Sequence, residues 1–463
     1  MRPARWPLNK GGSTYFLIGA AVLVVIVATV AALLVNGGSR HSAEASAAAP
    51  APPTATPAVV PVATGAPKPT PAGWAAALKQ PLSNPDLGAL TGRVTDALTG
   101  DQLWEQGSTV PMQPASTNKV LTTGAALLTL DPEARRTTTV VAPDQARQPG
   151  LVVLVGGGDP TLSSAPPGQE TLYRNAARIS DLAAQVRSSG IQVTAIQVDA
   201  SAFGGPSLAP GWDPADIFGG DVAPIEAVMV DGGRTQPLTP ESVRSLTPAL
   251  DAGRSLAGAL NVDPKAVTMA PTPVHGGTQI ASVQSPPLMD RLIEMMNHSD
   301  NVMAECIARE VANAVGRPAT FGDAVQAVTG LLSAAGVDMT GAVLMDGSGL
   351  SVDDRLTAKT LDDVIGTASG TSHQAMRPLL DVLPIAGGSG TLSNRFVDEQ
   401  SGDAAGWLRA KTGSLTGTNT LAGIVTDVSG RVLTFSLMSN NAGPTGRNAI
   451  DAVAATLRPC GCV

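Results

Sequence analysis

Aromatic residues make up only 3% of this 463-residue sequence, and no long block of basic or acidic residues occurs. Proteins that bind nucleic acids usually carry aromatic residues that stack on bases, or clustered basic residues that contact phosphates. The sequence has neither pattern, and its net charge is −8. Nucleic-acid binding therefore has no support.

Cysteine is also scarce, with only Cys306, Cys460 and Cys462. Their spacing does not resemble that of zinc ligands, and no histidine cluster accompanies them. A disulfide is chemically possible outside the cytoplasm. Three thiols allow one pair and one unpaired thiol in more than one way, so the connectivity stays open.

The four histidines are His41, His275, His298 and His373, and no G-x-S-x-G sequence occurs. A Ser-His-Asp triad can arise on several folds, but nothing in the local sequence supports one here. A serine enzyme of this composition would need another base, and lysine is the usual substitute.

The N-terminus combines basic residues with a long uncharged apolar segment. Arg2, Arg5 and Lys10 precede the segment Tyr15–Val35, and roughly 20 apolar residues span a bilayer as a helix. The apolar part of a cleaved signal peptide is shorter, about 7–15 residues. We therefore expect an uncleaved membrane anchor with a cytoplasmic N-terminus and the rest of the chain outside, although the small residues of Ala43–Ala49 leave cleavage open.

The chain length suggests about two or three domains. The interval after residue 136 alternates strand-like and helix-like segments, which is typical of an α/β domain. Strand-like hairpins at both ends of the remaining sequence are expected to close one sheet across this insertion. The predicted boundaries are 1–14 for the cytoplasmic N-terminus, 15–35 for the anchor, 36–73 for a Pro/Ala-rich linker, 74–136 and 283–463 for the catalytic domain, and 137–282 for the inserted domain.

One serine stands three positions before a lysine. Of all the lysines, only Lys119 has a serine, Ser116, three residues upstream. Positions i and i+3 share one face of a helix, so the amine can reach the hydroxyl and take its proton. The alternative is a helix-capping serine beside a solvated lysine.

Two more short motifs follow. Ser299-Asp300-Asn301 lies between two segments with helical periodicity, where its side chains can face a cleft or cap the second helix. Lys411-Thr412-Gly413-Ser414 lies in a strand-like segment. Alone, each motif is weak, because such residues are frequent in ordinary turns.

Their order is specific. Ser-x-x-Lys, Ser-Asp-Asn and Lys-Thr-Gly follow one another as in penicillin-binding proteins and class A β-lactamases. The stretches "PASTNKVLTTGAAL", "SPPLMDRLIEMMNHSDNVMAE", "DGSGLSVDDRLTA" and "AKTGSLTGTNTLAG" resemble the D-alanyl-D-alanine carboxypeptidase/endopeptidase family, which comprises class C low-molecular-mass penicillin-binding proteins of the S13 type. The resemblance runs from about Leu90 to Asn441.

The resemblance implies an α+β fold. We expect a serine β-lactamase/transpeptidase-like domain, with an antiparallel sheet flanked by helices, interrupted by an inserted α/β domain. The insertion looks short for the family, so a third nested domain that many members carry is expected to be reduced or absent. The membrane anchor replaces the cleaved signal of many members.

The resemblance also assigns catalytic roles. Ser116 is the expected nucleophile, and Lys119 the group that accepts its proton, with a pKa lowered by burial and by a neighbouring cation such as Lys411. Ser299 is expected to pass the proton to the leaving D-alanine, and Asn301 to hydrogen-bond the substrate amide. No metal or organic cofactor is needed.

The third motif is expected to bind substrate. Lys411 and Thr412 would hold its terminal carboxylate, and Gly413 would leave room for its backbone. The backbone N–H groups of Ser116 and Ser414 would form the oxyanion hole.

The resemblance implies peptidoglycan stem peptides as substrates and β-lactam antibiotics as covalent inhibitors, on the outer side of the cell membrane. A β-lactamase of the same fold is one alternative, although no Glu-x-x-Leu-Asn stretch lies between Lys119 and Ser299 to supply a class A deacylating glutamate. A transpeptidase is another, and a non-catalytic wall-binding protein a third. Preference for terminal D-alanine or for a cross-link stays open.

Overall fold

The structure is a computed structural model that describes residues 65–459. The predicted anchor, most of the predicted linker, and Cys460 and Cys462 lie outside these residues. Within residues 65–459, no helix is both long and apolar enough to cross a membrane.

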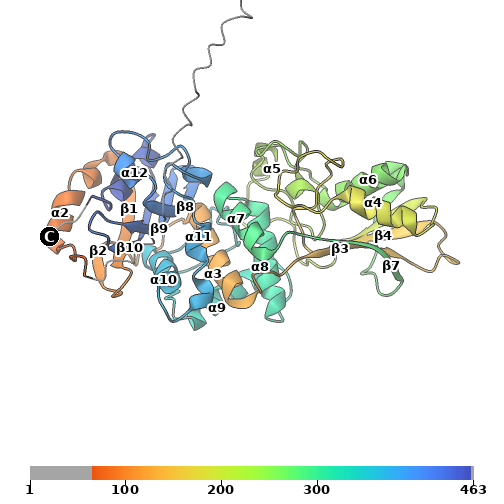
Figure 1. The fold of residues 1–463 in the computed structure, drawn as a ribbon, viewed down its shortest axis with the longest axis horizontal. Helices are drawn as coiled ribbons and strands as arrows, with labels where there is room; N and C mark the ends of the chain where they lie inside the picture. Colours follow the sequence, from red (N-terminus) through yellow and green to blue (C-terminus); the bar gives the residue numbers. More distant parts are fainter. Residues whose placement is uncertain (1–64, 460–463) are drawn as a thin grey trace, which may run out of the picture. The chain divides into compact units, whose positions relative to one another are not determined.

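Both ends of the described chain meet in one five-stranded antiparallel sheet (Figure 1). Its order is β2-β1-β10-β9-β8, and the register places Ala89 opposite Asn440. The predicted N-terminal and C-terminal hairpins therefore close one sheet, as expected. The strands are β1 (Ala89–Asp96), β2 (Gln102–Gln106), β8 (Leu408–Leu415), β9 (Thr418–Thr426) and β10 (Val432–Asn440).

Helices cover both faces of this sheet. On one face, α2 (Pro71–Leu78) and α12 (Gly446–Ala455) share a hydrophobic cluster with Leu433, Phe435 and Leu437, which alternate along β10 as one face of a strand requires. On the other face, α10 (Ala358–Ser369) packs against the same strand, and Thr434 Oγ1 donates to its residue Asp362 at 2.7 Å.

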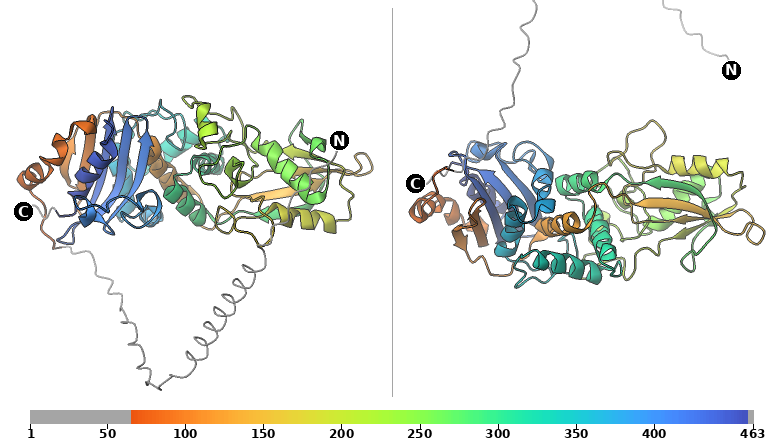
Figure 2. Two further views of the ribbon diagram at one scale, coloured as in Figure 1. Left: turned by 90° about the horizontal axis from the view of Figure 1, so that it is seen from above. Right: turned by 60° about the horizontal axis from the view of Figure 1, so that its bottom comes forward.

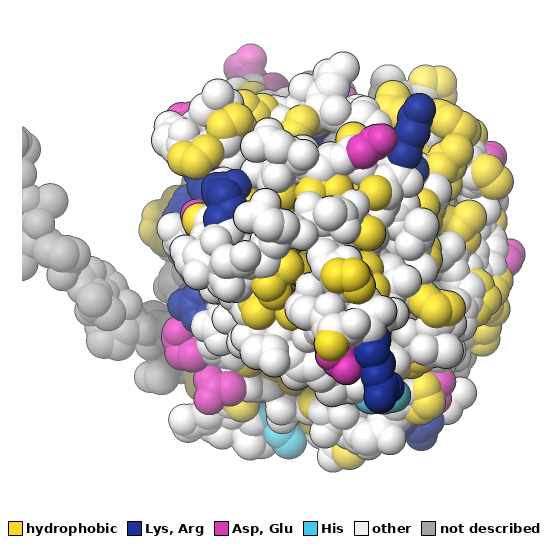
Figure 3. Space-filling view, turned by 90° about the vertical axis from the view of Figure 1, so that its right-hand side faces the viewer, with side chains coloured by type: hydrophobic (Ala, Val, Ile, Leu, Met, Phe, Trp, Pro, Cys, Tyr) yellow, Lys and Arg dark blue, Asp and Glu magenta, His cyan; other side chains and the backbone are white. Residues whose placement is uncertain are grey.

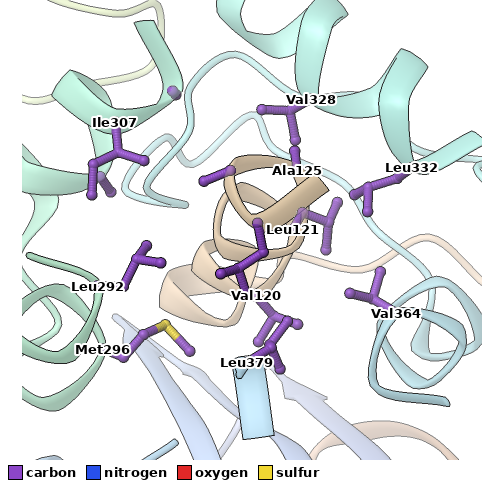
Figure 4. Close-up of a cluster of buried hydrophobic side chains, with 14 of the residues drawn as sticks. Val120, Leu121, Ala125, Leu292, Met296, Ile307, Val328, Leu332, Val364 and Leu379 are labelled. Carbon is purple, nitrogen blue, oxygen red and sulfur yellow. The ribbon is translucent and has the colours of Figure 1, made fainter. Parts of the chain in front are cut away.

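The helix that follows Ser116 is the centre of the second layer. α3 (Lys119–Thr129) is buried at nearly every position. Figure 4 shows Val120, Leu121 and Ala125 surrounded by side chains of the neighbouring helices. A helix held on all sides cannot shift without disrupting close packing. The surrounding helices are α7 (Leu288–His298), α8 (Asn301–Ala314), α9 (Phe321–Ala334), α10 and α11 (Leu379–Val382).

A second five-stranded sheet lies between residues 137 and 284 (Figures 1 and 2). Its order is β6-β5-β4-β3-β7, with β4, β5 and β6 parallel and β3 antiparallel to both its neighbours. The first and last strands pair, with Thr137 opposite Gln284, so this region leaves and rejoins the rest of the chain at one place. The strands are β3 (Thr137–Ala142), β4 (Leu151–Val155), β5 (Ala195–Asp199), β6 (Val267–Met269) and β7 (Thr278–Gln284).

Two helices, α4 (Ile179–Ser188) and α6 (Pro248–Leu260), share a hydrophobic cluster with this sheet. The sequence periodicity predicts a helix from Leu172, but α4 begins seven residues later. Arg178 is extended and forms an isolated bridge with Ser163. Leu172 and Ala176 pack instead against the hydrophobic cluster that surrounds α3, the α3 cluster. Their apolar spacing reflects burial in another core, not a helical turn.

The remaining elements are short. Figure 3 shows that, on the face formed by the inserted region, charged side chains lie singly or in small groups, several of them of both signs, among hydrophobic and other groups. The two sheets with their helices confirm the predicted α+β fold. The short elements are α5 (Ala215–Gly219), η1 (Pro81–Ser83), η2 (Pro85–Leu87), η4 (Asp231–Gly233), η5 (Pro264–Ala266), η6 (Gln374–Met376), η7 (Gly390–Leu392) and η8 (Gly402–Ala404).

Candidate active site

The predicted nucleophile lies in a tight turn that runs directly into α3. Ser116 belongs to the 3-10 helix η3 (Ala115–Asn118), and Lys119 is the first residue of α3. Because one turn separates them, Lys119 Nζ lies 2.9 Å from Ser116 Oγ. Ser116 is half-buried and Lys119 is completely buried. The alternative of a solvated lysine beside a capping serine is therefore wrong.

Ala115, which precedes the nucleophile, has a φ of +48°. A non-glycine residue in the left-handed region costs on the order of 1–3 kcal/mol and persists only where its surroundings fix it. Gly349 packs so closely that a Cβ on it would collide with the carbonyl oxygen of Ala115. The strained turn that presents Ser116 is thus held from outside.

Three hydrogen-bond acceptors surround Lys119 Nζ: Ser116 Oγ at 2.9 Å, Asn301 Oδ1 at 2.6 Å and Ser348 O at 2.9 Å. They match the three N–H groups of an ammonium ion. Burial lowers the pKa of Lys119 to about 8, although nearby carboxylates, Asp346 foremost, oppose the shift. Much of Lys119 is therefore neutral near pH 8 and able to accept a proton from Ser116.

The Ser-Asp-Asn motif forms the junction between α7 and α8. Ser299 ends α7 with a φ of +56°, and Asn301 is the first residue of α8. Asn301 bridges two parts of the chain, because its Oδ1 faces Lys119 while its Nδ2 donates to the carbonyl oxygen of Asp221 at 3.0 Å. Ser299 Oγ lies 2.9 Å from Lys411 Nζ.

Asp300 turns away from the nucleophile. Its carboxylate caps α8 by accepting the N–H of Met303 at 2.9 Å, so the capping interpretation is correct for this residue. The same carboxylate pairs with Arg234 at 3.3 Å and accepts the Tyr173 hydroxyl at 2.7 Å. Although burial raises it, the pKa of Asp300 lies well below its usual range because of Arg234, then Arg244, and these hydrogen bonds.

The Lys-Thr-Gly motif lies on β8, at the edge of the first sheet. Lys411 is fully buried, and its Nζ donates to Ser299 Oγ and to the carbonyl oxygen of Thr412 at 2.8 Å. Burial, and then the positive charge of Lys119, lower the pKa of Lys411 well below its usual range. The two buried ammonium groups repel each other, so the neighbouring cation contributes to the lowered pKa of Lys411.

The structure explains the need for glycine at position 413 differently from the sequence-based expectation. A Cβ on Gly413 would collide with Thr420 Oγ1, and would lie 2.7 Å from the carbonyl oxygen of Pro114 and 3.0 Å from Ala115 Cβ. These groups, not a substrate backbone, fill the space beside it. Gly413 lets β8 pack against the turn that carries the nucleophile, while the neighbouring Ser414 is exposed.

Several groups at the site were not predicted from the sequence. The backbone carbonyls of Asp221 and Ser348 hold Asn301 and Lys119, and a backbone carbonyl carries no signal of its own in a sequence. Thr391 Oγ1 lies 2.7 Å from Thr412 Oγ1. These residues lie on glycine-rich loops, and the conformation of such loops depends on tertiary contacts that the sequence does not show.

Within residues 65–459, no group of three or more His, Cys, Asp or Glu side chains is arranged to bind a metal ion. Cys306 is a buried free thiol in α8, and burial raises its pKa. It lies outside the set of groups around Ser116 and Lys119.

Comparison with known proteins identifies the family of this chain. Residues 74–241 and 237–458 match the D-Ala-D-Ala carboxypeptidase 3 (S13) family, and residues 1–61 match a Carboxypeptidase Rv3627c-like N-terminal domain. The chain is 65% identical to Carboxypeptidase DacB of Mycolicibacterium smegmatis and 60% identical to Carboxypeptidase Rv3627c of Mycobacterium tuberculosis, over 100% of each chain in both cases.

The crystal structure of penicillin binding protein 4 from Haemophilus influenzae has the same fold. It superimposes with a TM-score of 0.69 at 22% identity, over 83% of this chain and 98% of that chain. The family match covers most of the chain, and two relatives match it from end to end. The chain therefore belongs to the D-Ala-D-Ala carboxypeptidase 3 (S13) family.

Proposed function

We propose that this chain hydrolyses the D-Ala-D-Ala bond of peptidoglycan stem peptides through an acyl-enzyme on Ser116. Family membership makes the chain a serine-type D-Ala-D-Ala carboxypeptidase. The assignment of Ser116 as nucleophile and Lys119 as base rests on the contact of Lys119 Nζ with Ser116 Oγ at 2.9 Å, together with a Lys119 pKa of about 8.

In the first step, neutral Lys119 accepts the proton of Ser116 Oγ, which attacks the carbonyl carbon of the penultimate D-alanine. The backbone N–H groups of Ser116 and Ser414 stabilise the developing oxyanion. β8 is the edge strand of its sheet, so alternate backbone groups on it are not used by the sheet. An extended peptide can pair with such an edge, which supports Ser414 in this role.

In the second step, the amide bond breaks and the leaving D-alanine takes a proton from Ser299 Oγ. Ser299 in turn takes up the proton that Lys119 accepted from Ser116, which leaves Lys119 neutral again. The hydrogen bond of Ser299 Oγ to Lys411 and the contact of Asn301, at the same junction, with Lys119 support this role. Lys411 and Thr412 attract the terminal carboxylate of the substrate. Water then hydrolyses the ester on Ser116, and Lys119 serves again as the base.

β-Lactams fit the same chemistry. Their strained amide resembles D-Ala-D-Ala, and their carboxylate suits the Lys411 and Thr412 site. A solved structure of the Haemophilus influenzae penicillin binding protein 4 contains a β-lactam, which supports acylation of Ser116 by this class of compound. The opened ring stays attached, so it cannot leave as D-alanine does.

The N-terminal segment is a separate proposal. An uncharged apolar segment, Tyr15–Val35, preceded by Arg2, Arg5 and Lys10, supports a membrane anchor with the catalytic part on the outer side of the membrane. Protease treatment of intact spheroplasts tests this. Digestion of the catalytic part supports the proposal, whereas full protection in intact spheroplasts, with digestion only after lysis, contradicts it.

One experiment tests the function. The full-length protein is incubated with a D-Ala-D-Ala pentapeptide, with cross-linked muropeptides and with penicillin, and the products and the intact protein mass are determined. We expect release of D-alanine and one persistent penicillin adduct, both lost in Ser116→Ala. An adduct on Ser116→Ala would identify another nucleophile, and rapid drug turnover would favour a β-lactamase. Cleavage of the muropeptides would add endopeptidase activity.

A further inference from the structure

The loop of residues 346–351, the Asp346 loop, is clamped onto the nucleophile turn and α3. Three successive carbonyl oxygens of this loop accept hydrogen bonds: Asp346 O from Asn118 Nδ2 at 3.0 Å, Gly347 O from Thr122 Oγ1 at 2.6 Å, and Ser348 O from Lys119 Nζ at 2.9 Å. The position of the loop therefore fixes one of the three acceptors of Lys119.

The carboxylate of Asp346 holds this loop in shape. Its Oδ1 accepts the N–H groups of Ser348 at 3.0 Å and Gly349 at 2.6 Å, and its Oδ2 accepts that of Ser351 at 2.8 Å. Asp346 is completely buried. A buried carboxylate is costly unless several donors satisfy it, so the loop and the carboxylate stabilise each other.

The fourth donor comes from the inserted region. Trp212 Nε1 donates to Asp346 Oδ2 at 2.7 Å, and Ser351 Oγ donates to the carbonyl oxygen of Pro210 at 2.7 Å. The Trp212 ring stands edge-on to Phe321, with centroids 5.3 Å apart. The indole is thus fixed by packing, and its N–H is directed at the carboxylate.

We propose that Trp212 and Asp346 are positioning residues for the reaction, through which the inserted region holds the Ser348 carbonyl oxygen against Lys119. This inference rests on the proposed role of Lys119 as the base. Neither residue touches the nucleophile. Both act on Lys119 through the Asp346 loop, so their removal should change the proton affinity of Lys119 as well as the rate.

Several titratable groups face Lys119 and have to be weighed together. They are Asp346 with Asp354 on the segment that follows its loop, Asp300 and Glu305 of α8, and Lys411 of β8. Burial, and then Asp346, raise the pKa of Glu305 to about 7 and that of Asp354 well above its usual range. Asp346 is the foremost of the carboxylates that oppose the effect of burial on the pKa of Lys119. Loss of the Trp212 donor loosens the Asp346 loop and with it the contact of the Ser348 carbonyl oxygen with Lys119 Nζ. Because that oxygen is one of the three acceptors of the ammonium form, loosening it favours neutral Lys119.

Trp212→Phe is the cleanest test, because it removes the N–H donor and keeps an aromatic ring against Phe321. Trp74→Phe is a matched control: Trp74 is buried, and its Nε1 has no hydrogen-bond partner in the structure. The rate of Ser116 acylation by a fluorescent penicillin is measured on the full-length protein from about pH 6 to about pH 10, a range that spans the titration of the base.

For Trp212→Phe we expect the rate at the alkaline plateau to fall about tenfold, since a hydrogen bond to a buried charge is worth at least about that factor. We also expect the midpoint of the acid limb to move to lower pH by about one unit, the shift that a tenfold change in proton affinity produces. Trp74→Phe should leave plateau and midpoint unchanged. In Asp346→Asn, an amide N–H₂ group faces backbone N–H donors that need an acceptor. If this variant folds, its acylation rate at the plateau should fall further than that of Trp212→Phe.

Two results would overturn the inference: Trp212→Phe behaving like Trp74→Phe, or a lower plateau with an unmoved midpoint, which would mean that Trp212 only stabilises the fold. Failure of the unaltered protein to become acylated on Ser116 is a different result, and would contradict the proposed function itself.

Discussion

Lys119 and Lys411 are both fully buried, and each is hydrogen-bonded to one of the two serines of the site. The pairing of Lys119 with Ser116 could be predicted from the sequence, because a spacing of three residues brings side chains together at a helix start. The pairing of Lys411 with Ser299 could not, because these residues come from a strand edge and an interhelical junction that meet only through the tertiary fold.

The buried state of Lys119 predicts how acylation depends on pH. Only the neutral amine can accept the Ser116 proton, and the neutral fraction increases as pH rises through the Lys119 pKa of about 8. The rate of acylation by penicillin should therefore rise between about pH 6.5 and about pH 9. A rate that is flat or falls over this interval would show that Lys119 is not the base.

Lys411 should matter most for substrates that carry a terminal carboxylate. Lys411→Ala should lower the kcat/KM for a D-Ala-D-Ala peptide by about a hundredfold, as loss of a buried charge partner does, and should affect the corresponding C-terminal amide much less. Lys359→Ala is the control, because Lys359 pairs with Asp338 and Asp363 away from the site. Equal losses for acid and amide would contradict carboxylate binding by Lys411.

At the scale of elements, the hairpins and the helices on either side of Ser299 could be predicted because each has a clear apolar period and a turn between. The start of α4 could not, because Leu172 and Ala176 have helical spacing but pack against the α3 cluster. The Asp346 loop has no periodicity at all. Its shape follows from donors on α3 and the inserted region, and from the Glu305 carboxylate of α8, which accepts the N–H of Gly347 at 3.0 Å.

The contact between β8 and the nucleophile turn predicts the effect of Gly413→Ala. The added methyl would collide with Thr420 Oγ1 and crowd Pro114 and Ala115, so we expect a loss of about 1–3 kcal/mol in the free energy of unfolding and slower acylation. Gly330→Ala is the matched control, because its Cβ would meet open space on α9 and should stabilise the helix by about 0.5–1 kcal/mol. Denaturant unfolding measures both, and unchanged stability in Gly413→Ala would contradict the close contact.

At the scale of the whole molecule, the described part of the predicted linker, residues 65–73, includes residues that pack on the fold. α2 begins at Pro71, and Thr70 caps it by accepting the N–H of Gly73. Further upstream, the carbonyl oxygen of Ala66 accepts a hydrogen bond from Arg431. Alanine and proline richness predicts an extended spacer, but it does not tell where such a segment begins to pack on a neighbouring core.

The chain should therefore tolerate removal of residues before Gly65, but not removal of α2. A chain beginning at Gly65 should hydrolyse D-Ala-D-Ala peptides and keep its stability. A chain beginning at Pro81 lacks Trp74 and Leu78, which are each 1% exposed, and should lose about 5 kcal/mol or more, because each large apolar side chain removed from a core costs several kcal/mol. Thermal unfolding compares the two chains, and equal stability would mean that α2 contributes nothing to the core.

The pairing of β1 with β10 also orders events during biosynthesis. A ribosome releases Ser116 first, whereas the strands β8, β9 and β10, which complete its sheet, emerge only after the whole inserted region. The sheet of β3–β7 lies wholly within residues 137–284 and can close while translation continues, since domains fold as units from the N-terminal side. An unfinished chain thus carries the nucleophilic serine without Lys411 or the strand edge beside it. We therefore expect hydrolytic capacity to arise only after β8, β9 and β10 have emerged and paired with β1.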